Sequence, residues 1–168
     1  MRYLYKIGSL GLILIFLQTF HAYGQIGTGE LPISWKLKTS LPEPPVIEMP
    51  SRDYETLRQQ SLQPDGLKKL RFAKMIGVDI DVKEKAKGQV MGDGTLYRLA
   101  IRSEGAYSLN LVFDSYQLPP GAKLFVYNRE QDHSRGAFTK DNNKTAGVLP
   151  VGPVKGEQVT IEYYEPHE

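Results

Sequence analysis

A stretch of alternating apolar and polar residues between Tyr97 and Tyr127 constrains the fold of this chain more than any other feature. Its middle part is apolar at every second position, at Tyr107, Leu109, Leu111 and Phe113. A period of two places alternate side chains on opposite faces of a β-strand, so one face is predicted to be core and the other solvated. The run from Leu124 to Tyr127 is apolar at every position, which is typical of a central strand.

Residues 78–82, 97–102 and 159–164 show the same alternation. In the last of these segments Ile161 and Tyr163 are predicted to face the core, and Glu162 to face solvent. Many short strands with almost no helix indicate an all-β fold, namely an antiparallel β-sandwich of jelly-roll-like strand order. A closed barrel is the alternative.

Glycine and proline mark the turns between these strands. Leu118 to Gly121 fits a type II turn with Pro120 at the second position and Gly121 at the third. Asp93 and Gly94 suit a tight hairpin turn.

Residues 1–24 have the pattern of a secretory signal peptide. A head with Arg2 and Lys6 precedes the apolar run from Leu10 to Leu17, and Ala22-Tyr23-Gly24 is a small-x-small cleavage site. The apolar run is too short for the alternative, a membrane-spanning anchor. Cleavage after Gly24 predicts a secreted or periplasmic protein that is not held in the membrane.

Removal of this leader also neutralises the chain. The full sequence has 21 basic and 19 acidic residues; the leader contains two basic residues and no acidic one, which leaves 19 of each. A neutral chain of mixed charges gives no electrostatic basis for binding nucleic acid. The absence of cysteine excludes disulfides, thiolate metal sites and a cysteine nucleophile.

Residues 25–70 read as a proline-rich, extended lead-in that ends in a linker helix from Ser51 to Gln63, capped by Ser51 or Asp53. Alternation from Ile33 to Leu37 suggests an edge strand, and we interpret the lone Trp35 as a core plug or staple for this arm rather than a ligand platform. The β domain is predicted to span residues 71–166.

The remaining candidate sites are weak. Asp79 and Asp81 would share one strand face and could hold Ca²⁺, but such a site needs more oxygen ligands, so we favour a solvated face. Tyr116 and Tyr164, with Tyr127 and Tyr163, could form a surface aromatic platform for carbohydrate. No other metal site and no cofactor is predicted.

No catalytic residues are predicted either. Asp132-His133-Ser134 contains the residue types of a serine protease triad, but sequence neighbours cannot face one another in that relay, so we interpret it as a polar loop. A hydrolase is therefore the least favoured of the possible functions.

Six sequence blocks, in order, resemble one family. They are Gly105 to Phe113, Leu118 to Asn128, Gly136 to Thr139, Asn142 to Lys144, Pro153 to Glu157, and Ile161 to Pro166. Together they resemble the N-terminal, non-catalytic domain of secreted trypsin-like serine endopeptidases of the lysyl endopeptidase type, as found in Bacteroidetes.

The resemblance implies a pro-region or accessory domain that packs on or assists a trypsin-like protease domain. In that family the protease domain follows this region, and the present sequence ends at Glu168, where it would begin. The alternative function is a stand-alone extracellular domain that binds carbohydrate or a surface.

Overall fold

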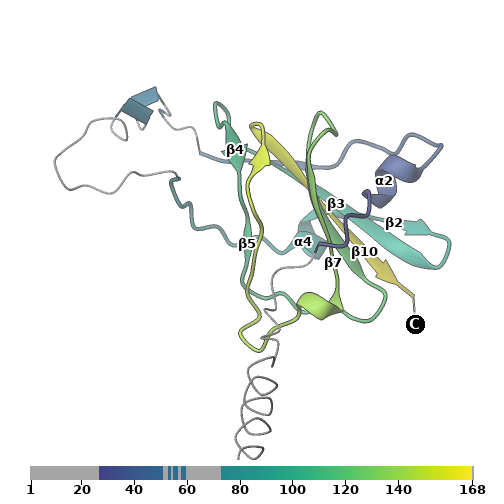
Figure 1. Ribbon diagram of the computed structural model, residues 1–168. Helices are drawn as coiled ribbons and strands as arrows, with labels where there is room; N and C mark the ends of the chain where they lie inside the picture. The colour runs from purple at the N-terminus through teal and green to yellow at the C-terminus, as the bar shows by residue number, and fades with distance from the viewer. Residues whose placement is uncertain (1–26, 51–52, 54, 57, 60–72, 168) are drawn as a thin grey trace, which may run out of the picture.

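The computed structural model describes residues 27–50, 53, 55–56, 58–59 and 73–167, and it is predominantly β (Figure 1). The predicted signal peptide and most of the predicted linker helix lie outside these residues. Within that helix, the carboxylate of Asp53 accepts a hydrogen bond from the Thr56 amide (3.0 Å), as expected of a cap. No helix in the described part of the chain has the length and apolar character needed to cross a bilayer.

One large sheet organises the molecule, in the strand order β1-β3-β10-β6-β7. These strands are β1 (Val46–Glu48), β3 (Gly94–Arg102), β10 (Gln158–Pro166), β6 (Lys123–Asn128) and β7 (Ser134–Phe138). Strand β2 (Lys87–Met91) pairs with the first half of β3, and β1 pairs with its last three residues. The β1–β3 pairing is parallel, so the sheet is mixed. The prediction of a purely antiparallel arrangement is wrong at this edge.

A two-stranded ribbon lies beside this sheet. Strand β4 (Ser108–Leu109) pairs with β9 (Val154–Lys155), and β5 (Val112–Phe113) pairs with β8 (Leu149–Pro150). The Val151 amide donates to the Leu111 carbonyl (2.8 Å) between the two pairs, so they form one ladder with an irregularity in the middle.

The main core lies between the ribbon and one face of the sheet, which we call the inner face. Its largest buried members are Ile101, Leu124, Val126, Phe138, Val159, Ile161 and Tyr163 from the sheet, and Tyr116, Leu149, Val151 and Val154 from the ribbon and its adjoining loop. Leu109, Leu111 and Phe113 pack against it, as their alternation predicts. Tyr107 does not, because its side chain is 77% exposed.

The predicted turns are partly confirmed. Gly121 has φ +80° and the Ala122 amide donates to the Pro119 carbonyl, which is the hydrogen bond of the predicted type II turn. In the β2–β3 hairpin the positive φ falls on Gly92 (+53°), while Gly94 already belongs to β3, so the turn lies one residue earlier than expected.

Two predicted strands are wrong. Residues 78–81 form no strand, and helix α4 (Val82–Lys85) follows because the Asp81 carboxylate accepts a hydrogen bond from the Glu84 amide (2.9 Å) and caps it. The segment from Ile33 to Leu37 is not an edge strand but a single helical turn, α2 (Ile33–Lys36). Pro32 precedes that turn, where a proline can begin a helix without losing a needed donor.

Candidate functional site

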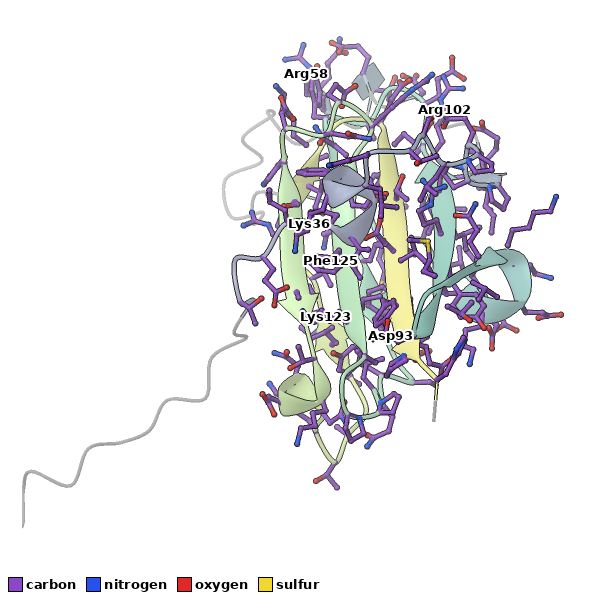
Figure 2. All side chains as sticks on the ribbon, turned by 90° about the vertical axis from the view of Figure 1, so that its right-hand side faces the viewer. Lys36, Arg58, Asp93, Arg102, Lys123 and Phe125 are labelled. Carbon is purple, nitrogen blue, oxygen red and sulfur yellow. The ribbon has the colours of Figure 1, made fainter. Side chains whose placement is uncertain are left out.

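The face of the sheet opposite the ribbon, here called the outer face, is covered by residues 27–45, which we call the strap. The strap starts at β7, where the amides of Thr28 and Gly29 donate to the carbonyls of Ala137 and Gly136 (both 3.2 Å). It ends at β3, where the Pro45 carbonyl accepts from the Ala100 amide (2.8 Å). Figure 2 shows helix α2 lying over the sheet near Phe125. The first half of the predicted lead-in is therefore joined to the sheet and is not a separate segment.

Glu162 on β10 is the centre of this contact. Its side chain is fully buried, and its Oε1 accepts hydrogen bonds from the backbone amides of Ile33 (2.6 Å) and Ser34 (3.2 Å). Burying a carboxylate is costly unless its oxygens are hydrogen-bonded. The two strap amides supply those bonds, so the acid and the strap stabilise each other.

Tyr127 on β6 completes the polar cluster. Its hydroxyl donates to Glu162 Oε2 (3.1 Å) and lies 3.1 Å from the Ser34 hydroxyl. Burial, and after it the neighbouring Glu162 charge, raise the pKa of Tyr127, so the phenol stays neutral and able to donate.

An apolar cluster surrounds this polar centre. Phe125, Tyr127 and Ala137 are buried on the sheet side, and Ile33 and Trp35 pack on them from the strap. The rings of Trp35 and Tyr127 meet edge to face, with centroids 5.2 Å apart. The interpretation of Trp35 as a staple for the arm agrees with this contact.

Arg98 brings a charged side chain to the same face. Arg98 on β3 lies opposite Glu162 on β10 in the strand register, and its side chain is buried. Its guanidinium donates hydrogen bonds to the Pro42 carbonyl and to Gln89 Oε1. Its Nε, like Trp35 Nε1, is buried without a hydrogen-bond partner among the described residues. The outer face therefore holds a positive and a negative side chain under the strap, unlike the apolar inner face.

The strap is also held at its rim by an ion pair. Lys123 Nζ lies 2.7 Å from Glu30 Oε2, and Lys36 Nζ lies 3.6 Å from the same oxygen. The hydrogen bond from Lys123 lowers the pKa of Glu30 more than any other cause does. Because these groups are partly exposed, the ion pair contributes little to stability, and its main effect is to position the strap on the sheet.

This arrangement is suited to binding a peptide segment. Both oxygens of Glu162 are occupied by hydrogen bonds, so the carboxylate is not a free general base. In the described part of the chain, no group of three or more His, Asp or Glu residues could hold a metal ion.

Asp79 and Asp81, the pair considered for Ca²⁺ although a solvated strand face is favoured, do not lie on a strand. Asp79 is exposed in a segment without regular structure, and Asp81 caps helix α4, so the two acids do not share a strand face. The error follows from treating residues 78–82 as a strand.

The predicted aromatic platform is also absent. Tyr116 is 4% exposed and its hydroxyl donates to the Thr139 carbonyl (2.8 Å), so it belongs to the inner core. Tyr127 and Tyr163 are buried on opposite faces of the sheet. Tyr164 alone remains half-buried, and its hydroxyl donates to Asp93 (2.6 Å).

Asp132 and His133 lie in the predicted polar loop between β6 and β7, whereas Ser134 is already the first residue of β7 and pairs with Tyr127. His133 Nδ1 accepts a hydrogen bond from the Lys155 amide (3.1 Å), and the carboxylate of Asp132 accepts one from the side chain of Asn128. Asn128 also binds the amides of Asp132 and His133, so these side chains fix the turn of the hairpin.

Sequence reasoning missed Glu162, which it placed on a solvated face. A signal was present on the neighbouring strand, because residues 124–127 of β6 are apolar on both faces. An apolar residue on the outer face of β6, such as Phe125, needs cover, and the same cover extends over β10. The only Trp of the chain, in the lead-in, is a suitable part of that cover.

No family model matches this chain, and no solved structure matches it. The geometry of the described residues and the six resembling blocks are therefore the basis for a functional proposal.

Proposed function

We propose that this chain is an exported, non-catalytic β domain that packs on or assists a trypsin-like serine protease domain, in the manner of a pro-region or accessory domain. Six sequence blocks of the lysyl endopeptidase type support the choice of partner. The leader supports export, with cleavage after Gly24.

Exposed apolar side chains outside the strap carry the proposal. Tyr107, directly before β4, and Val112 on β5 are exposed at the ribbon. Met75, which is 88% exposed, and Val78 are exposed in the segment before α4. Exposed tyrosine and methionine are enriched where proteins meet other proteins. The ribbon is thus the surface we assign to the protease domain.

The finer fold is part of the same proposal. The ribbon would be the second layer of a β-sandwich of jelly-roll-like order, with the sheet as the first layer. The shared core between the two layers supports this.

The test uses the mature chain and a protease domain of the lysyl endopeptidase type that has been unfolded in denaturant. We expect the mature chain to increase the recovery of protease activity on dilution, or to bind and inhibit the refolded protease. A Tyr107→Ser variant should lose this effect.

Val90→Ser is the matched control. Val90 is as exposed as Tyr107, at 77%, but lies on β2, on the other side of the molecule (Figure 1). Both variants should melt like the parent chain, because exposed positions rarely change stability by more than about 0.5 kcal/mol. Equal effects of both variants on the protease, or none from the parent chain, would rule out the ribbon as the contact surface.

The alternative, a carbohydrate- or surface-binding domain, has less support. Of the four tyrosines considered for its platform only Tyr164 is not buried, and that hydroxyl already binds Asp93. Retention of the mature chain on a polysaccharide column, abolished by Tyr164→Ala, would favour it.

A further inference from the structure

The outer face recognises the strap by features that any copy of this chain carries. Glu162 binds two consecutive backbone amides, Tyr127 meets a serine hydroxyl and an indole ring, and Lys123 binds a carboxylate. The partners in these contacts are more than 90 residues apart in sequence. None of these contacts is between sequence neighbours, so a strap from another copy could make the same contacts.

The link between the bound turn and the sheet is exposed and partly stiff. Lys38, Thr39 and Ser40 are exposed and follow Leu37, the residue after α2. The prolines at 42, 44 and 45 restrict the remainder of the link to extended backbone. Residues 38–45 can span at most about 26–29 Å when fully extended, and this is the reach of the strap once the link opens.

We propose that the outer face is a peptide-recognition site whose occupant in trans is the strap of a second copy, so that two chains exchange straps and form a dimer. Each sheet in the dimer keeps the contacts that residues 27–37 make with the outer face, but receives them from the other chain. The exchange conserves these contacts at the cost of opening one link per chain, which includes the hydrogen bond from Arg98 to the Pro42 carbonyl. It takes place on the outer face and leaves the ribbon, assigned above to a protease domain, uncovered.

Charge complementarity identifies this occupant. The site offers the carboxylate of Glu162 to main-chain donors at its centre and the ammonium of Lys123 at its rim. The strap offers the backbone amides of Ile33 and Ser34 at the start of α2, and both donate to Glu162. It also offers the carboxylate of Glu30, four residues before Ser34. A segment that places an acid, a serine and an indole at this spacing is present in every copy of the chain.

The first experiment needs no variant. Light scattering measures the mass of the mature chain from micromolar to millimolar concentration, after incubation that allows the strap to open. We expect the mass of one chain at the lowest concentration and of two chains at the highest. A single-chain mass throughout would overturn the proposal.

The second experiment distinguishes strap exchange from any other dimer, because Trp35 is the only Trp of the chain. W35A keeps an intact outer face but has a weakened strap and no indole emission. E162Q/Y127F keeps an intact strap but has a weakened face, where docking should be weaker by more than about tenfold. Trp35 Nε1 is buried without a partner when docked, so release of the strap should shift the emission to longer wavelength.

Mixing the two variants should return the emission of E162Q/Y127F to the wavelength of the parent chain and give the mass of two chains. In the control, E162Q/Y127F is mixed with W35A/E162Q/Y127F instead of W35A. This triple variant has a weakened strap and a weakened outer face, so the emission of E162Q/Y127F should not shift. Unchanged emission with W35A, or an equal shift with the control, would contradict exchange. If E162Q/Y127F alone emits like the parent chain, Glu162 and Tyr127 are not the anchor and the proposal fails.

Discussion

The two faces of the large sheet are both buried, but by different means. The inner face meets the ribbon through apolar side chains such as Val126 and Ile161. The outer face meets the strap through a carboxylate, a phenol and backbone amides, with Phe125 and Trp35 beside them. Apolar contacts tolerate many shapes, whereas a buried acid requires its donors at fixed positions.

This difference separates stability from recognition. The inner face gains free energy roughly in proportion to the apolar area removed from water. On the outer face each hydrogen bond contributes little net free energy of folding. Removing one partner costs more, because a buried polar group is then left unsatisfied. The strap is therefore the more selective of the two covers, and substitutions on matched residues can measure how the two faces differ.

The largest expected effect compares two phenylalanines. Phe125→Ala on the outer face and Phe138→Ala on the inner face should each lower the free energy of unfolding by about 3–5 kcal/mol, because both side chains are buried and leave cavities. Urea denaturation measures both. If Phe125→Ala costs less than a third of Phe138→Ala, the strap is a loose cover and the outer face is not a true core.

The next effect concerns the buried acid. Glu162→Ala should cost about 2–4 kcal/mol, because it leaves the amides of Ile33 and Ser34 and the Tyr127 hydroxyl without their acceptor. The exposed Glu104→Ala is the control and should change stability by less than about 0.5 kcal/mol. A neutral Glu162→Ala would mean that water replaces the carboxylate at no cost.

A pair of tyrosines gives a smaller and cleaner comparison. Tyr127→Phe removes a hydroxyl that donates to a carboxylate, and Tyr116→Phe removes one that donates to a backbone carbonyl. We expect costs of about 1.5–3 kcal/mol for the first and about 0.5–1.5 kcal/mol for the second, because bonds to charged groups are stronger. Thermal melting of both variants checks the order, and the reverse order would remove the distinction between the faces.

The smallest effect is at the rim of the strap and depends on pH. The pKa of Glu30 lies below its ordinary value of 4.5 because Lys123 donates to it. A lowered folded-state pKa adds stability above the unfolded pKa and loses it as pH falls through the folded value. Lys123→Gln should thus cost at most about 1 kcal/mol at pH 7 and nothing at an acid pH below the lowered folded-state pKa of Glu30. Urea denaturation at the two pH values measures this, and a cost that persists in acid would assign Lys123 another role.

Local chemistry in the sequence was enough to predict part of the fold. Alternation identified the inward-facing residues of β5 and β10, such as Phe113 and Ile161, because a strand repeats every two residues. Pro120 and Gly121 specified their turn, since only glycine readily adopts its positive φ. Alternation failed at residues 78–82, where Asp81 caps a helix that the apolar spacing does not reveal.

The segment that covers the outer face could not be predicted from local sequence, because it comes from a distant part of the chain. Whether Glu162 is solvated or buried depends on the strap, whose residues lie about 130 positions earlier in the chain. The same holds for the parallel pairing of β1 and for the burial of Tyr116 and Tyr127. Local periodicity reports which face of a strand a residue occupies; it contains no information on which distant segment packs against that face.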